Sequence, residues 1–328
     1  MERIEQFPEH ETSDRFERLA RKALASYGLA EARLRDLKAA SHSAFEVRTG
    51  DPARHYALRI LGPDGDLKQL ERETLWLTAL CQDTDLVVPE PVLSMDGHLV
   101  RKVAIAGVHG VRPCVLLRWA DGSSVDEDLT PDHVNRVGRS VAALHVHAET
   151  FRWPEEITPP RRNATLMSEV LDIRLLKSAF DASEINLFRT AIDRIAETMA
   201  RLRDGPEVAG TIHGGLHRRS VLFAGNGDVR LVGFDGCRWG YYAYDLAVVV
   251  GWIERREAAE EMLDELFEGY RTIRSLPDEV KRSVPTFAAL RAIDRIQAVL
   301  HRPERATAAE RVLTEEMDRL RRILAAET

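Results

Sequence analysis

The 328-residue chain has 44% hydrophobic and 30% charged residues, which is enough apolar material for two lobes with cores of their own. Its formal net charge is -7 and its pI is about 5.9, whereas nucleic-acid-binding proteins usually carry a basic surplus, so we expect no nucleic-acid partner. Three separated cysteines without a Cys-x-x-Cys pair argue against disulfides and zinc and favour a reducing compartment. The N-terminus has no apolar signal core and no apolar run approaches about 18 residues, so we expect a cytoplasmic protein without a membrane partner.

The first third of the chain combines helices with strands. Apolar residues recur at helical spacing in two stretches, and polar and apolar residues alternate in four others. The turn at residues 49–52 joins two of the alternating stretches into a hairpin. In chain order, the predicted elements are a helix at 12–28, strands at 44–48 and 55–61, a helix at 66–81, and strands at 98–106 and 112–119. The strand pattern begins near residue 30, ahead of these four strands, and together they predict a small antiparallel sheet of about five strands.

The pattern after residue 119 is mostly helical. Helical spacing of apolar residues predicts helices at 131–149, 242–257, 259–274, 279–301 and 304–325, and two within 163–203 that divide near 181–183. The predicted fold class is therefore α+β, with strands concentrated near the N-terminus.

The most informative stretch runs from Thr211 to Ala247. Short apolar runs at 220–223 and 229–232 flank Gly225-Asn226-Gly227-Asp228, a sequence typical of a hairpin turn. An apolar helix opens near Tyr244. The order is thus loop, strand, tight turn, strand, loop and helix.

This layout resembles the catalytic segment of the aminoglycoside phosphotransferase and choline kinase-like family, a small-molecule branch of the protein kinase fold. That family has His-Gly-Asp, an Asn after four further residues, a hairpin, Ile-Asp-Phe or a near variant, and later Tyr-Asp-Leu-Ala. The matching residues are His213, Gly214, Phe234, Trp239, Gly240, Tyr244, Asp245, Leu246 and Ala247. The resemblance implies a bilobal protein kinase-like fold, with a sheet lobe at residues 1–118 and a helical lobe at 119–328. It also implies that Asp245 braces the catalytic loop by hydrogen bonds.

Three positions depart from the family. Gly215 stands where the family has the aspartate that orients the attacking hydroxyl, and Ser220 and Gly233 stand where it has the metal-binding asparagine and aspartate. Glycine supplies no side chain, and a serine hydroxyl is a poor magnesium ligand. Asp235 follows Gly233 by two residues, so on an extended strand it would point to the same side, about 6–7 Å further along. The candidate catalytic residues are thus Gly215, at the altered base position, His213 and Asp235, and His213 is expected to be a structural hydrogen-bonding group in this loop.

The resemblance also assigns the residues that would contact a nucleotide. Arg59 lies where kinases have a phosphate-contacting lysine, and Glu73, with Glu71 in reserve, is the glutamate expected to pair with it. The turn that includes Ser41 and Ser43 corresponds to the one that lies over the nucleotide phosphates. The hinge that holds adenine corresponds to Arg118, Trp119 and Ala120. Without the resemblance, these would be an exposed strand arginine, solvated glutamates and an ordinary turn.

Three interpretations remain open at this point. The first is a pseudokinase that binds ATP, ADP or a regulatory small molecule, with no magnesium site expected from these residues. The second, from the enzyme class, is a weak phosphotransferase acting on a hydroxyl or amine of a small-molecule acceptor and using Asp235 for the metal. The third is an engineered, inactivated variant. The residues name no protein partner.

The acceptor pocket of the family is built by variable helices, here about 155–205 and 255–300. Glu169, Asp172 and Glu254 could face a cationic acceptor there, or simply face solvent. His145 and His147 invite a metal interpretation, but alternate residues on a helix diverge by about 200°, so the two cannot grip one ion.

Overall fold

The computed structural model describes residues 9–37, 43–50, 52–125, 128–161, 172–203, 205–301 and 306–326. The chain divides into two units that are described separately below. Unit 1 is Met1–Asp121 with Pro154–Thr158, and unit 2 is Gly122–Trp153 with Pro159–Thr328.

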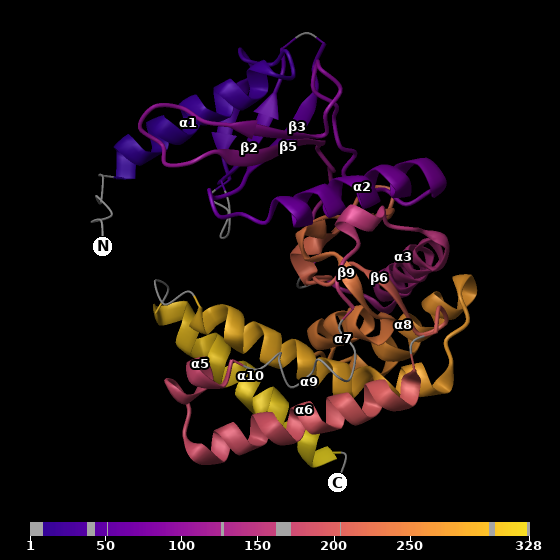
Figure 1. The fold of residues 1–328 in the computed structure, drawn as a ribbon. Coiled ribbons are helices and arrows are strands. Elements are labelled where there is room, and N and C mark those ends of the chain that lie inside the picture. The colour runs from indigo at the N-terminus through magenta and orange to yellow at the C-terminus, as the bar shows by residue number, and fades with distance from the viewer. Residues whose placement is uncertain are drawn as a thin grey trace. The chain divides into compact units, whose positions relative to one another are not determined.

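Unit 1 is built on a five-stranded antiparallel sheet in the order β1-β2-β3-β5-β4. Two helices accompany it (Figure 1), and a short 3-10 turn, η1, joins the unit from Glu155–Ile157. The element bounds are α1 Glu9–Ala25, β1 Arg33–Asp36, β2 Ser43–Arg48, β3 His55–Ile60, α2 Leu67–Asp83, β4 Val100–Val103 and β5 Arg112–Arg118. The predicted antiparallel sheet is confirmed.

Alternation along β3 decides which residues enter the core of unit 1. Tyr56, Leu58 and Ile60 are buried on one face, in a cluster with apolar residues of α1. Arg59 lies between them in sequence and therefore projects from the opposite face, the face from which it pairs with α2. A strand with this alternation can hold a cation on one side and a core on the other.

Unit 2 is mostly helical and contains two short strand pairs, β6 with β9 and β7 with β8. Its helices are α3 Pro131–Thr150, α5 Ile173–Lys177, α6 Ala182–Leu202, α7 Tyr242–Ile253, α8 Ala259–Ile273, α9 Asp278–Leu300 and α10 Ala306–Ala326. Its strands are β6 Ala209–Ile212, β7 Val221–Phe223, β8 Val229–Leu231 and β9 Arg238–Tyr241, with 3-10 turns η3 Arg218–Ser220 and η4 Phe234–Gly236.

Two glycines let α3 and α8 pack with their backbones close together. A Cβ on Gly138 would lie 2.2 Å from the Leu266 carbonyl oxygen, and one on Gly269 would lie 2.0 Å from the Asn135 carbonyl oxygen. Neither neighbour can yield easily, because each is helix backbone. The side chains at both positions are therefore restricted to a hydrogen atom, which sets the distance between the two helices.

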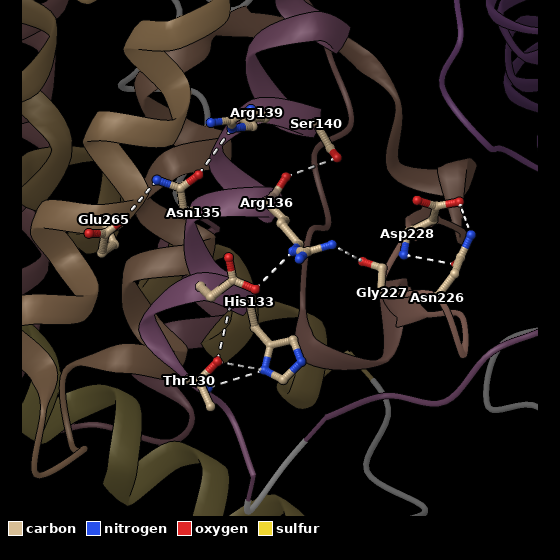
Figure 2. A network of polar contacts seen from close by, with 11 residues as sticks. Thr130, His133, Asn135, Arg136, Arg139, Ser140, Asn226, Gly227, Asp228 and Glu265 are labelled. Atoms are coloured by element: carbon tan, nitrogen blue, oxygen red, sulfur yellow. Dashed lines mark hydrogen bonds and ion pairs between the residues drawn. The ribbon is translucent and has the colours of Figure 1, made fainter.

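The N-terminal turns of α3 also hold the β7–β8 hairpin (Figure 2). Arg136 donates from Nη1 to the Gly227 carbonyl at 3.3 Å, while its Nε is 2.9 Å from an Asp132 carboxylate oxygen. Thr130 caps the helix by accepting from the His133 N–H. The hairpin that follows residues 213–220, the candidate catalytic loop, is thus tied to a capped helix.

The structure differs from the sequence prediction in three respects. The four-residue strands β6 and β9 were not predicted, because each contains a glycine and neither alternates over a useful length. Helix α7 ends at Ile253 rather than at 257, and α1 begins at Glu9 and ends at Ala25. Among the described residues, no helix has the combination of length and apolar character needed to cross a bilayer.

Candidate functional site

In unit 1, β3 and α2 bring together the predicted cation and glutamate. Arg59 Nη1 forms an ion pair with Glu73 Oε1, and Glu73 is only 2% exposed. A buried carboxylate needs such a partner, because desolvation disfavours its charged form. The predicted contact between Arg59 and Glu73 is confirmed, and Glu73 rather than Glu71 makes it; the role of the pair in nucleotide binding stays a prediction.

The remaining nucleotide-side residues are placed as follows. Ser41 lies outside the described residues, and Ser43 begins β2 opposite Ile60. Arg118 ends β5 and forms an ion pair with Glu90 at 2.5 Å. Trp119 stacks on the ring of His55, with centroids 4.3 Å apart, and donates its N–H to the His55 carbonyl at 3.0 Å. Ala120 follows directly. The expected hinge is therefore anchored to the sheet on its N-terminal side.

In unit 2, the buried carboxylate of Asp245 braces the candidate catalytic loop. Its two oxygens accept from the backbone N–H groups of His213 and Gly214, each at 2.8 Å. Burial alone would raise the pKa of Asp245, but hydrogen bonds and charge interactions with His145, together with His213 and Gly214, lower it. The predicted bracing role of Asp245 is confirmed. The contact with His145, at 3.3 Å, was not predicted.

His213 is a fully buried hydrogen-bonding group. Its Nε2 lies 3.1 Å from the Val232 carbonyl oxygen, and its Nδ1 lies 3.3 Å from the Gly215 N–H. These partners are satisfied by a neutral ring with the proton on Nε2. Burial lowers the pKa of His213, which favours the same neutral form. The structural role expected for His213 agrees with these contacts, whereas a direct role in catalysis stays a prediction.

The two adjacent glycines of the loop have different conformations. Gly214 has φ of 74°, and a Cβ there would meet the Gly236 carbonyl oxygen at 2.3 Å. Gly215 has no positive φ, and the nearest atom to a Cβ there is His213 Nδ1 at 3.9 Å. A side chain at position 215 would therefore meet little steric resistance, and the steric constraint lies at Gly214.

Ser220, at the family's metal-asparagine position, is 1% exposed and is engaged inside the loop. Its hydroxyl donates to the Gly215 carbonyl at 2.9 Å and contacts His217 Nδ1 at 2.9 Å. With its proton donated and one lone pair used, the hydroxyl has one lone pair left, so it could offer a metal ion no more than one neutral oxygen.

Gly233 does not end an extended strand, as the sequence predicted. It has φ of 78° and ψ of 49°, and Phe234–Gly236 forms a 3-10 turn. The prediction that Asp235 lies 6–7 Å further along a strand is therefore wrong. Because the chain turns, Asp235 Oδ1 lies 3.9 Å and Ser220 Oγ lies 3.2 Å from the point that a Gly233 Cβ would occupy. The two metal positions and Asp235 thus come together.

The residues at these positions do not fit the magnesium site that the family implies. Magnesium requires near-octahedral oxygen ligation, commonly from one or two carboxylates. Here the Ser220 hydroxyl is engaged, Gly233 has no side chain, and Asp235 brings a single carboxylate near the Gly233 Cβ position. Within the described ranges, no group of three or more histidine, cysteine, aspartate or glutamate side chains is arranged to hold a metal ion.

The acidic residues considered for a cationic acceptor have other roles. Asp172 caps α5 by accepting from the Leu175 N–H at 3.0 Å. Glu254 forms an ion pair with Arg319 at 3.0 Å. Glu169 lies outside the described residues. His145 points its Nδ1 at the Tyr270 hydroxyl, 2.9 Å away in the core, which is a packing role.

Comparisons with known proteins agree with this arrangement. A family model described as the phosphotransferase enzyme family matches residues 33–283. An uncharacterized protein of Deinococcus radiodurans is 28% identical over 279 residues, covering 82% of this chain and 77% of that protein. A homoserine kinase of Neisseria meningitidis serogroup B is 27% identical over 206 residues, covering 61% of this chain and 62% of that kinase.

Solved structures share the fold over almost the whole chain. The microcompartment-associated aminopropanol kinase superposes with a TM-score of 0.74 at 27% identity, covering 92% of this chain and 94% of its own. The amicoumacin kinase hAmiN, in complex with AMP-PNP, Ca²⁺ and Ami, superposes with a TM-score of 0.76 at 18% identity, covering 95% and 96% of the two chains. A small antiparallel sheet followed by a helical region is thus the bilobal architecture of small-molecule kinases.

Proposed function

The chain belongs to the phosphotransferase enzyme family, and we propose that it is a nucleotide-binding member whose phosphoryl-transfer site is impaired. The proposal separates two parts of the family's machinery. The parts that position a nucleotide are retained, and the parts that would move the phosphoryl group are not.

The engaged Ser220 hydroxyl carries the second half of the proposal. Phosphoryl transfer in this fold depends on a residue that orients the nucleophile and on metal ions that bridge the phosphates. Gly215 and Gly233 supply no side chain for either task, and the Ser220 hydroxyl is already bonded to the Gly215 carbonyl. The polar groups of the loop bond to one another and are not presented to a substrate or a metal ion.

The residues expected to contact a nucleotide support the first half of the proposal, that the chain binds a nucleotide. Arg59 is held by Glu73, so a guanidinium is fixed on the sheet in the place of the family's phosphate-contacting lysine. Among structural neighbours, hAmiN is a complex with AMP-PNP, and the spectinomycin phosphotransferase APH(9)-Ia is a complex with ADP. We therefore propose ATP or ADP as the ligand of unit 1, and a small-molecule acceptor or regulator as the ligand of unit 2, in a cytoplasmic protein.

Calorimetric titration of ATP tests this proposal directly. We expect the dissociation constant to change by less than tenfold, or about 1.4 kcal/mol, between excess magnesium and EDTA. Arg59→Met should weaken binding under both conditions, because the guanidinium contact is lost. A magnesium effect greater than tenfold in the unchanged protein would contradict the impaired metal site.

One observation favours the alternative, a weakly active small-molecule kinase. Asp235 Oδ1 lies 3.9 Å from the Cβ position of Gly233, close to where the family's metal-binding carboxylate begins. If Asp235 replaces that carboxylate, Asp235→Asn should abolish any magnesium dependence of ATP binding. The same titration, repeated on this variant, distinguishes the two functions.

A further inference from the structure

Unit 2 contains a cavity of about 700 Å³ beside the candidate catalytic loop. Its walls come from the loop at 217–219, from α7 and the turn after it, from α9 and from α10. Helices α9 and α10 lie side by side (Figure 1). A cavity of this volume accommodates a metabolite-sized ligand.

The lining of this cavity is strongly basic. It contains nine arginines and three glutamates, a surplus of six positive charges in a chain whose formal net charge is -7. Each glutamate is taken by one arginine: Arg295 with Glu316 at 2.6 Å, Arg311 with Glu315 at 3.1 Å, and Arg319 with Glu254 at 3.0 Å. Each carboxylate therefore neutralises one arginine, and the surplus of six positive charges remains.

Four of the lining arginines have no such partner. Within the described part of the chain, none of their guanidinium groups forms a hydrogen bond or an ion pair with another residue. They are Arg219, Arg255, Arg291 and Arg322. Like charges gathered around one hollow repel each other, and an anion bound there relieves that repulsion.

Arg319 is a preorganised part of the site. It is only 9% exposed, and its buried Nε has no hydrogen-bond partner among the described residues. Its two terminal nitrogens lie 2.8 Å from the point that a Cβ on Gly251 would occupy, so the glycine makes room for the guanidinium. A buried donor without a partner among the described residues is suited to donate to a bound ligand.

We propose that this cavity binds a small-molecule polyanion, a compound with two or more phosphate or carboxylate groups. Guanidinium groups bind both kinds of anion in bidentate fashion, and several of them converge here. The residues that line this cavity all belong to unit 2, and their charge is opposite to that of the acidic pocket that a cationic acceptor would need. Since His217 lines the cavity and also contacts Ser220, a bound anion would lie next to the loop that carries Gly215.

Titration with inorganic pyrophosphate and with citrate, both without magnesium, tests the proposal. The two probes distinguish a site for phosphate groups from a site for carboxylate groups. We expect at least one probe to bind to the full chain with a dissociation constant below 1 mM, a value set by the order of magnitude of metabolite affinities. The double variant Arg255→Glu/Arg322→Glu should weaken that probe at least tenfold. The control Arg174→Glu/Arg189→Glu, at two exposed arginines of unit 2 outside the lining, makes the same charge change and should leave binding within twofold.

A second variant keeps the test valid if the charge reversals unfold the protein. Gly251→Ala improves helix propensity but places a methyl group against the Arg319 guanidinium, so it should weaken the probe while leaving the fold intact. Three results would overturn the proposal: neither probe binds, the control weakens binding as much as the cavity variants, or Arg59→Met removes binding and the cavity variants do not. Tighter binding of a single-stranded oligonucleotide than of either probe would overturn the assignment to a small molecule.

Discussion

At the scale of single residues, the candidate loop depends on glycine in two different ways. Gly214 and Gly233 adopt positive φ, of 74° and 78°, where a side chain is strained. Gly215 does not, and its surroundings are open. The backbone conformation therefore requires glycine at position 214, whereas it does not require glycine at position 215.

This contrast gives a prediction with an internal control. Gly214→Ala should lower the free energy of unfolding by about 2 kcal/mol or more, from the left-handed conformation and from the contact with the Gly236 carbonyl. Gly215→Ala should change it by no more than about 0.5 kcal/mol. Urea denaturation of the full chain measures both. Equal losses in the two variants would show that the conformations of these glycines have been misassigned.

Restoring the family's aspartate at position 233 would place a side chain on a residue in the left-handed conformation. Aspartate is among the residues that tolerate the left-handed region, so Gly233→Asp should fold at a cost of roughly 1 kcal/mol. Its Cβ would also lie 3.2 Å from Ser220 Oγ, which must shift slightly. The left-handed conformation of Gly233 could not be predicted, because a short motif does not specify φ.

At the scale of elements, three helices of unit 2 meet at a buried polar centre. His145 on α3 contacts the Tyr270 hydroxyl on α8 through Nδ1 and the Asp245 carboxylate on α7 through Nε2. Burial lowers the pKa of His145 despite the nearby carboxylate. The same helices carry the brace of the candidate loop, so the loop's order is linked to the packing of the helices.

The histidine pKa directions predict how stability depends on pH. A histidine with a lowered pKa in the folded state contributes stability that is complete above its unfolded value, about 6.5, and that is lost as pH falls below it. His145 and His213 both belong to this class. The pKa of Asp245 is also lowered, but its contribution is lost only near and below pH 4, the range of an unfolded aspartate.

We therefore expect the free energy of unfolding to fall between pH 7.5 and 5.5, with a slope of at most about 1.4 kcal/mol per pH unit for each buried histidine. His145→Gln should reduce that slope, whatever its effect on stability at neutral pH. Urea midpoints measured across this range provide the test, with exposed His98→Gln as the control. An unchanged slope in His145→Gln would show that this ring is charged in the folded protein.

The elements also show how far the sequence could be interpreted alone. The contact between Arg59 and Glu73 could be predicted, because strand alternation and helix spacing each fix a face. The bracing by Asp245 followed from the resemblance. The arginine-lined cavity could not be predicted, since its residues come from segments as far apart as His217 and Arg322 and share no motif.

At the scale of the whole molecule, the chain keeps the fold of a small-molecule kinase over residues 33–283 while its transfer site is altered. The scaffold residues that match the family perform structural tasks, such as the bonds that the Asp245 carboxylate accepts from the backbone N–H groups of His213 and Gly214. The three departures fall at positions where a side chain would act on substrate or metal. These observations are the basis for the proposal that transfer is impaired while the fold is retained.

The most direct measurement is magnesium-dependent ATP turnover by four proteins: the unchanged chain, Gly233→Asp, the triple variant Gly215→Asp/Ser220→Asn/Gly233→Asp, and Asp235→Ala. We expect no turnover above background from the unchanged chain and little from Gly233→Asp, which still lacks the base. The triple variant should gain turnover, or slow hydrolysis of ATP when no acceptor is supplied, because it regains the base and both metal ligands. Turnover by the unchanged chain that equals that of the triple variant, and that disappears in Asp235→Ala, would contradict the claim that the transfer site is impaired.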